Sequence, residues 1–163
     1  MERLLAALEI SKIGVWDFNE KLDTVFFSKS SKSIIGFEDD PSFGTNTDDW
    51  NNLVHPEDRK KYFQDYQDHI NGLKPLYINK HRVKCKDGTY KWILDKGKII
   101  NDHKSDGYIH FVGTHTDITD EIKNETKVEN ALTIATKQNN KLKNFAHIVT
   151  HNLKQYSGTL KVS

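Results

Sequence analysis

The sequence predicts an α+β fold with one five-stranded antiparallel sheet, a helical middle segment and a long C-terminal helix. Two strand candidates lie near the N-terminus, several short helix candidates follow, and three more strand candidates come after these. Sequential strands joined by tight turns pair as antiparallel neighbours, which favours one sheet with helices packed against it. Residues 131–163 contain no proline and one glycine, so this stretch is predicted to be an uninterrupted helix.

Composition excludes several classes of protein. The 163 residues include 24 Lys and Arg against 23 Asp and Glu, and this balance does not favour a nucleic-acid binder. Uninterrupted apolar runs reach only about five residues, which is too short for a membrane segment. The single cysteine, Cys85, excludes a disulfide framework and fits a reducing environment, so we expect a cytoplasmic protein.

Local patterns predict the first elements. Residues 1–11 place leucines at helical spacing and indicate a short N-terminal amphipathic helix. The apolar segments 13–18 and 24–27 flank a polar stretch and predict a β-hairpin. A short helix is expected next, over residues 29–35, where Gly36 ends it and either Ser28 or Ser30 caps its start.

The helical middle continues with two further helix candidates. Residues 47–50 predict a short capped helix with acids in its first turn. The segment 55–58, His-Pro-Glu-Asp, predicts the start of a longer helix, because proline suits the first helical position and acids suit the positive helix end. Gly72 is expected to end this helix. Its apolar stripe comprises Tyr62, Phe63, Tyr66 and Ile70.

Three strand candidates close the domain, at residues 76–85, 89–100 and 107–116, and Asp87-Gly88 predicts a tight turn between the first two. Alternation in these strands is imperfect, and both faces of the sheet carry apolar residues. The helical middle is therefore expected to cover one face. Either the N-terminal helix or a partner subunit would cover the other face.

Three motifs follow one another along the strand and helix candidates. The first is Trp50-x-x-Leu-Val-His-Pro-Glu-Asp-Arg59, the second is Lys86-Asp-Gly-Thr-Tyr-Lys-Trp-Ile93, and the third is Gly113-Thr-His-Thr-Asp-Ile-Thr119. In this order they resemble the PAS family of sensor domains over roughly residues 10–120. The resemblance implies a PAS sensor domain at residues 12–118, and fold alone does not identify its ligand.

The resemblance also implies a cavity between the sheet and the helical middle, with output through the C-terminal helix. We expect Tyr62, Tyr66 and Trp92 to line this cavity, which would admit a small-molecule ligand. The signalling motif is expected at Asp117-Ile118-Thr119. Charged residues at the positions of Arg82 and Asp117 pair in the family; the alternative from sequence is two unlinked surface charges.

No cofactor and no metal are expected in this chain. The flavin-binding versions of the family carry a reactive cysteine in an Asn-Cys-Arg motif on a helix, whereas Cys85 lies on a strand candidate. His69 on the long helix could be argued as a haem ligand, but a single helical histidine is more often hydrogen-bonded or solvated. No Cys/His pair has the spacing of a zinc site.

A heptad pattern of apolar residues runs along the C-terminal segment and predicts helices that pack lengthwise in a homodimer. The alternative is one amphipathic helix folded back on the domain. Residues 119–143 are interpreted as a coiled-coil signalling linker, with a register change near 122–128 and Asn139 as a register-setting polar position. The seam comprises Val128, Leu132, Ala135, Asn139, Leu142, Ala146, Val149 and Leu153.

Residues 144–163 resemble the start of the phosphoacceptor and dimerisation segment of sensor histidine kinases. The resemblance assigns His151 as phosphoacceptor, Asn152 as the residue orienting its ring, and Gln155 as a position with a possible role in dephosphorylation. Asn152 stands where the family often has an acid. His147 would be a non-acceptor or part of an adventitious metal pair; two solvated surface histidines are the alternative.

The two resemblances together predict the sensory and phosphoacceptor portion of a two-component sensor histidine kinase. The 163 residues contain no glycine-rich nucleotide site, so this chain alone is not expected to be an enzyme. ATP and Mg²⁺ would enter through a separate ATP-binding domain, and a response regulator would be the phosphotransfer partner. The alternative is a freestanding PAS dimerisation or protein-interaction module without phosphoryl chemistry.

Overall fold

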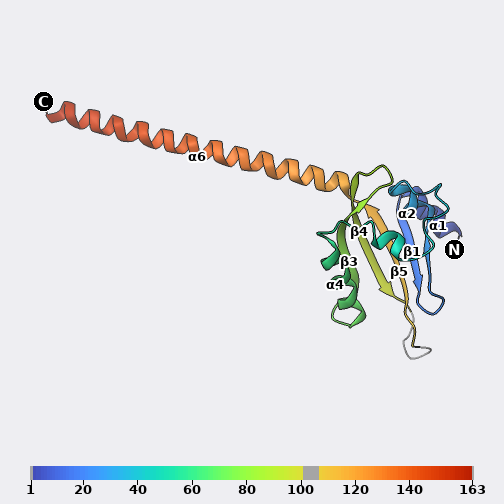
Figure 1. Ribbon diagram of the computed structural model, residues 1–163. Helices are drawn as coiled ribbons and strands as arrows, with labels where there is room; N and C mark the ends of the chain where they lie inside the picture. The colour runs from blue at the N-terminus through green and yellow to red at the C-terminus, as the bar shows by residue number, and fades with distance from the viewer. Residues whose placement is uncertain (1, 101–106, 163) are drawn as a thin grey trace. The chain divides into compact units, whose positions relative to one another are not determined.

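The computed structural model describes residues 2–100 and 107–162 of the chain (Figure 1). Side chains within these ranges are described as far as Tyr156. Met1, the first residue of the predicted N-terminal helix, and Ser163, the last residue of the predicted phosphoacceptor segment, lie outside the described residues.

The chain divides into two compact units, the first ending at Asp120 and the second beginning at Glu121. A single helix, α6 (Thr119–Val162), starts at the end of the first unit and continues through the second. The elements that precede it are α1 (Glu2–Ile10), β1 (Gly14–Asn19), β2 (Thr24–Phe27), α2 (Lys29–Ile34), α3 (Asp48–Asn51), α4 (Arg59–Ile70), β3 (Tyr77–Lys84), β4 (Tyr90–Ile99) and β5 (His110–Asp117).

The five strands form one sheet in the order β2-β1-β5-β4-β3, with every neighbouring pair antiparallel. This confirms the predicted α+β class. Trp16, Gly113, Gly97 and Tyr77 lie in one row across the sheet. The Trp16 ring lies over the two glycines, because a Cβ atom on Gly113 would come within 2.2 Å of it and one on Gly97 within 2.6 Å. Glycine is therefore required at both positions.

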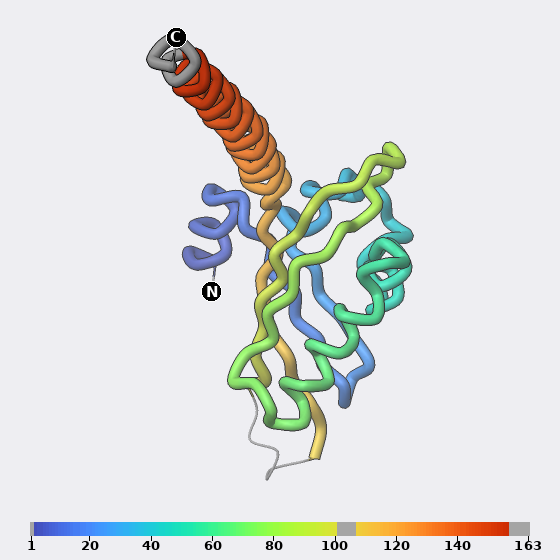
Figure 2. The backbone as a smooth tube through the Cα atoms, turned by 90° about the vertical axis from the view of Figure 1, so that its left-hand side faces the viewer, coloured from blue at the N-terminus to red at the C-terminus, as the bar shows by residue number. Residues whose placement is uncertain are grey.

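The predicted helical middle covers one face of the sheet, and α4 and α1 lie on opposite sides of it (Figure 2). α1 covers its own side only in part. None of its residues is fully buried, and Leu5 and Leu8 are half-buried. The same outer face leaves Phe26 and Ile78 each 50% exposed, so α1 does not cover it completely.

The core lies between the inner sheet face and the helical middle. Residues from the sheet and from the helical segments contribute to it, and fully burying a large apolar side chain stabilises the fold by about 1.5–3 kcal/mol. The most deeply buried apolar members are Ile35, Trp50, Val54, Val83, Ile93 and Phe111.

The long helix of the middle segment starts later than predicted. α4 begins at Arg59, and a turn at residues 56–58 precedes it. His55 Nδ1 accepts the backbone N–H of Glu57 at 3.1 Å, whereas the Asp58 side chain makes no capping bond. The Asp58 carboxylate instead accepts hydrogen bonds from the backbone and guanidinium of Arg82 on β3. Asp58, expected in the first turn of the helix, therefore forms a tertiary ion pair instead.

The two shorter helices differ in how they start. At α2, Ser28 is the N-cap and its hydroxyl accepts the Ser31 N–H at 3.3 Å, which selects one of the two predicted caps. At α3, Thr47 occupies the cap position without a side-chain bond, and the Asn46 side-chain oxygen next to it accepts the Asp49 N–H at 3.1 Å. The Asp49 carboxylate of this helix accepts the backbone N–H groups of residues 44–46.

Candidate functional site

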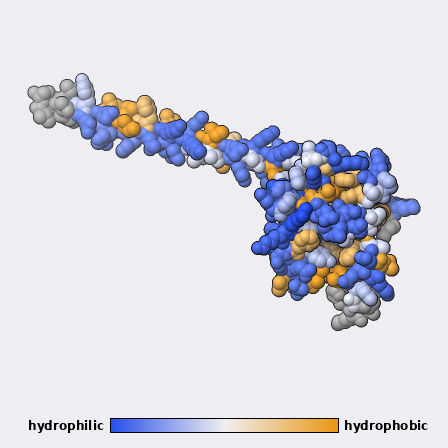
Figure 3. Space-filling model, viewed as in Figure 1, coloured by the Kyte–Doolittle hydropathy of each residue, from blue (hydrophilic) through white to orange (hydrophobic). Residues whose placement is uncertain are grey.

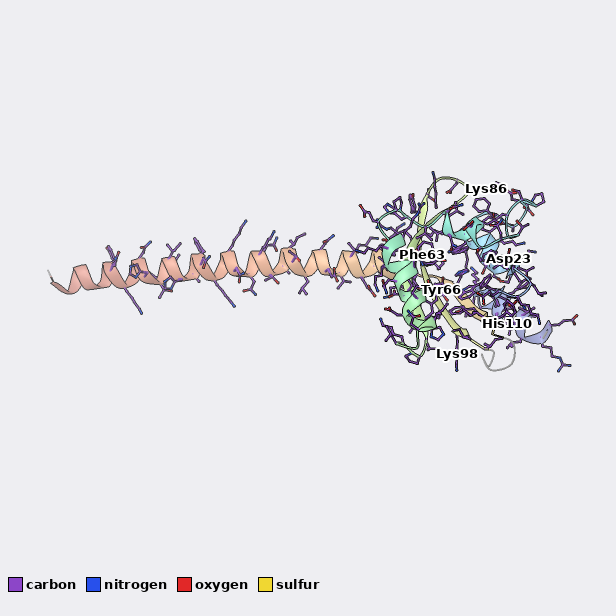
Figure 4. The ribbon with its side chains drawn as sticks, turned by 60° about the horizontal axis from the view of Figure 1, so that its bottom comes forward. Asp23, Phe63, Tyr66, Lys86, Lys98 and His110 are labelled. Atoms are coloured by element: carbon purple, nitrogen blue, oxygen red, sulfur yellow. The ribbon has the colours of Figure 1, made fainter. Side chains whose placement is uncertain are left out.

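A cavity of about 200 Å³ lies between the inner sheet face and helices α3 and α4. Its wall is dominated by aromatic rings from both layers, and Phe63 on α4, labelled in Figure 4, is 47% exposed at the rim. The lining residues are Trp16, Phe18, Val25, Phe27, Thr47, Trp50, Asn51, Tyr62, Phe63, Tyr66, Tyr77, Asp95, Phe111 and His115. Mostly apolar cavities with few polar groups are typical of small-molecule sites, and this cavity is smaller than the range of about 300–1,000 Å³ that is usual for them.

The polar end of the cavity is formed by Asp95 on β4 and His115 on β5, each 2% exposed. The Trp16 indole donates a 2.7 Å hydrogen bond to Asp95 Oδ1. His115 Nε2 lies 3.5 Å from Asp95 Oδ2, and its Nδ1 lies 3.0 Å from the Ser31 hydroxyl oxygen. Trp50 stacks on the His115 ring with centroids 3.8 Å apart and planes 4° from parallel. Strand pairing sets Asp95 opposite His115, and the stacked Trp50 ring holds the His115 ring in place.

A chain of hydrogen bonds leads from the cavity wall toward the surface. Trp50 Nε1–H donates to His81 Nε2 at 3.1 Å, and an indole can only donate, so His81 Nδ1 carries the imidazole hydrogen. His81 Nδ1–H then donates to Asn79 Oδ1 at 2.9 Å, and Asn79 Nδ2 donates to Asp65 at 2.8 Å. Lys61 Nζ pairs with Asp65 at 2.9 Å. Burial lowers the pKa of His81 to about 4, so the ring is neutral.

The structure places Tyr62 and Tyr66 in the cavity wall, but it does not bring the third predicted residue, Trp92, to them. In the alternation of β4, Ile93 faces inward and is fully buried, so Trp92 lies on the opposite face of the sheet. There its ring contacts the Arg82 guanidinium at 5.2 Å. The predicted position of Trp92 is wrong, and ligand binding by the two tyrosines stays a prediction.

Asp95 and His115 were not predicted as cavity residues. The register of the strands would have indicated them, because Asp95 lies two residues from both Ile93 and Gly97 and therefore shares their inward face. The β4–β5 pairing then sets His115 directly opposite Asp95.

The predicted signalling motif, Asp117-Ile118-Thr119, connects the end of β5 to the start of α6. Asp117 Oδ1 accepts the Thr119 N–H at 3.0 Å and its hydroxyl at 2.6 Å. The Thr119 oxygen accepts the backbone N–H of Trp92 at 3.0 Å, and Ile118 N–H donates to the Trp92 carbonyl at 2.9 Å. All three motif residues thus attach the first turn of α6 to β4.

Arg82 does not pair with Asp117, so the pairing suggested by the family is wrong; the two charges are not linked to each other, and each has another partner. Arg82 forms ion pairs with Asp58 at 2.9 Å and Glu57 at 3.1 Å. Hydrogen bonds from Arg82 lower the pKa of Asp58. Asp117 instead lies 3.7 Å from Lys91 Nζ, which also donates to the Ile34 carbonyl at 2.8 Å.

The residues considered for cofactor chemistry make ordinary protein contacts. His69 Nδ1 lies 2.9 Å from the Lys74 carbonyl, and its Nε2 accepts the Ile99 N–H at 3.1 Å. Cys85 is buried just after β3, and burial raises the pKa of its thiol. Within the described residues, no three His, Cys, Asp or Glu side chains converge in a group suited to a metal ion.

The second unit presents its predicted site on α6. Gln155 Nε2 lies 3.2 Å from His151 Nε2, and the His147 and His151 rings are stacked with centroids 6.5 Å apart. His151 and Asn152 are both exposed. His151 lies two residues from both Val149 and Leu153, which places it about 160° around the helix from each of these seam positions.

The seam of α6 carries exposed apolar residues, visible as orange side chains along the helix in Figure 3. Val128 is 67% exposed, Leu132 66%, Leu142 68% and Leu153 62%. The same spacing continues one step beyond the predicted seam to Tyr156, which is 66% exposed. No helix in the described part of the chain has the length and apolar character needed to cross a bilayer.

Five antiparallel strands, a helical layer on one face and an aromatic cavity between them define a small α+β sensor domain. The model of the PAS fold matches residues 24–115, and the chain belongs to this family. Comparison with curated proteins found no match.

Several solved structures are similar to the chain. A sensory box histidine kinase/response regulator from Burkholderia thailandensis E264 is 25% identical, with a TM-score of 0.68, and the match covers 83% of this chain and 98% of that one. The N-terminal domain of a diguanylate cyclase with PAS/PAC sensor from Marinobacter aquaeolei is 20% identical, with a TM-score of 0.56 and coverages of 67% and 97%. A PAS domain from Colwellia psychrerythraea is 16% identical, with a TM-score of 0.56 and coverages of 73% and 97%. The last two likenesses concern the fold alone.

Proposed function

We propose that this chain is the sensory and phosphoacceptor portion of a sensor histidine kinase. The PAS domain would sense a signal, and paired α6 helices would transmit it to His151. The observation that carries the proposal is the position of His151 on a continuous helix, opposite the apolar seam and downstream of a PAS domain. The similarity to the Burkholderia kinase/regulator protein supports it. The match covers 83% of this chain and therefore extends beyond the first unit, which ends at Asp120, into α6.

The chemistry proposed for His151 needs a neutral, accessible imidazole nitrogen. An imidazole is nucleophilic in its neutral form. His151 is exposed, and the amide nitrogen of Gln155 lies 3.2 Å from its Nε2. Gln155 could hold a water molecule near a phosphorylated ring, which would suit a role in dephosphorylation. Asn152 can orient the ring but cannot take its proton.

Dimerisation of α6 is proposed as the link between the PAS domain and His151. Each copy exposes a seam of valine and leucine, and an isolated helix with such a seam is stabilised mainly by packing against another helix. Pairing along this seam would leave His151 on the outer surface of the helix pair. An ATP-binding domain and a response regulator could then both reach it.

Restoring ATP chemistry tests the proposal. The full product of the gene, incubated with radiolabelled ATP and Mg²⁺, is expected to acquire phosphate that is labile in acid and stable in base, as a phosphohistidine is. The 163-residue chain alone serves as the control and should remain unlabelled. Absence of label from the full gene product under signalling conditions would contradict the proposal.

A second function is a PAS interaction module whose helix only dimerises or binds a partner. Asn152 in place of an acid favours this alternative, because an amide gives no general-base assistance. The two functions differ in one outcome: the module would dimerise through the same seam but carry no phosphohistidine.

A further inference from the structure

The cavity of the PAS domain combines aromatic faces with one buried carboxylate. Trp16, Trp50, Tyr62, Tyr66 and Tyr77 all contribute rings to its wall. Among the described residues that line it, Asp95 is the only acid, and no lysine or arginine is present. A buried carboxylate is costly unless it is paired, so the partners of Asp95 decide what the cavity can bind.

The two partners of Asp95 are the Trp16 indole and the His115 ring. Oδ1 accepts the Trp16 indole N–H at 2.7 Å, whereas Oδ2 has His115 Nε2 at 3.5 Å, beyond the range of a good hydrogen bond. In the described part of the chain, no lysine or arginine forms an ion pair with Asp95. Its charge acts within the cavity: burial raises the pKa of Tyr77, and Asp95 raises it further.

We propose that this cavity binds a small organic cation whose ammonium or similar N–H group pairs with Asp95 Oδ2. The proposal rests on the proposed sensory function of the PAS domain and names the chemical class of its ligand. Aromatic faces attract a desolvated cation by about 2 kcal/mol or more, and the carboxylate adds a charged hydrogen bond. An anionic ligand would meet repulsion from both the carboxylate and the ring faces.

The cavity volume limits the size of the ligand. A cavity of about 150 Å³ admits benzene. The present volume of about 200 Å³ therefore fits one ring, or an aliphatic group of similar size, with a short charged substituent. A primary aralkyl amine has this form, with an apolar body for the rings and an ammonium group for Asp95.

Strand β4 provides a route from such a ligand to the start of α6. Asp95 lies three residues from Trp92 on this strand, and the Trp92 backbone binds both Ile118 and Thr119. A ligand that pairs with Asp95 therefore contacts the same strand that holds the first turn of α6.

Three probes of equal ring size test the proposal on the 163-residue chain: benzylammonium, benzyl alcohol and benzoate. Quenching of tryptophan fluorescence reports binding, since Trp16 and Trp50 line the cavity. Benzylammonium is expected to bind at least about tenfold more tightly than benzyl alcohol, and benzoate more weakly still. Asp95→Asn should bring the cation and the alcohol to similar affinity. Asp17→Asn, on the outer sheet face, is the matched control and should keep the preference.

The ranking in the unmodified chain is decisive even if Asp95→Asn fails to fold. Equal binding of cation and alcohol, tighter binding of benzoate, or no binding of any probe at millimolar concentrations would overturn the proposal. This readout needs no ATP. If the chain binds the cation but the full gene product shows no histidine phosphorylation, the kinase proposal is rejected and the ligand proposal stands. If histidine is phosphorylated but the cation does not bind, only the ligand proposal is rejected.

Discussion

The hydroxyl oxygen of Thr119, at the start of α6, accepts the backbone N–H of Trp92 on β4 at 3.0 Å. The same hydroxyl donates to Asp117 at 2.6 Å, so the Thr119 side chain bonds both to β4 and to the residue before the first turn of α6. The bond joins the strand that carries Asp95 to the helix that carries His151. A change at the cavity end of β4 therefore has a direct covalent and hydrogen-bonded connection to the first turn of α6.

Replacing Thr119 with valine is expected to lower the stability of the PAS domain. Valine keeps the shape of threonine but leaves the Trp92 N–H without its acceptor, at a cost of about 1 kcal/mol or more. Urea denaturation of the chain measures this. Thr126→Val, where the threonine hydroxyl bonds only its own helix at the Ile122 carbonyl, is the control and should change stability by less than about 0.5 kcal/mol. Equal losses in the two variants would show that the Trp92–Thr119 bond has no special role.

Acid is expected to destabilise the fold through His81. Its pKa is lowered to about 4 by burial, against about 6.5 in the unfolded chain. Between these values the unfolded state binds a proton that the native state does not. Stability is therefore lost as pH falls from 6.5 toward 4, by up to about 3 kcal/mol, and the effect is absent above 6.5.

The matched variant for this pH dependence is His81→Gln, since glutamine can accept from Trp50 and donate to Asn79 without titrating. Urea midpoints measured across the window are expected to fall less steeply in the variant than in the parent chain. The remaining acids and histidines contribute the same pH dependence to the parent chain and to the variant. The same slope in both proteins would mean that His81 does not keep its low pKa.

Dimerisation is expected to depend on the seam and not on apolar exposure in general. Leu142→Lys places a charge in the seam of both copies and should raise the dimer dissociation constant about a hundredfold or more. Ile134→Lys makes the same kind of change at an exposed position outside the seam and should leave the dimer intact. Light scattering gives the mass of each variant. A dimer that survives Leu142→Lys would exclude this seam as the interface.

The order of the elements could be predicted from sequence because turns, caps and apolar segments are local signals. Gly36 and Gly72 adopt φ values of +82° and +76° after α2 and α4, and their conformational freedom marks these ends in the sequence. The start of α4 could not be predicted in the same way. The acids of residues 57 and 58 look like helix-start residues, but Arg82, distant in sequence, recruits both of them.

The location of the cavity, between the sheet and the helical middle, could be predicted from the sequence. Its lining residues could be predicted only in part. Tyr62 and Tyr66 lie four residues apart on one side of α4, as the helical spacing predicted, but the fully buried residues of this helix are Asp65 and His69. Trp92 was misplaced because aromatic character does not reveal which sheet face a residue occupies, and its neighbour Ile93 takes the inward position. The partners of Asp95 come from other strands, so the polar end of the cavity required knowledge of the strand register.

The assignment of His151 is tested most directly by mapping the phosphate in the full gene product. With ATP and Mg²⁺ supplied, His151→Gln is expected to abolish the acid-labile label. His147→Gln removes the neighbouring ring, 6.5 Å away, and should leave most of the label in place. Label that survives His151→Gln, or that disappears with His147→Gln instead, would contradict the assignment of His151 as the phosphoacceptor.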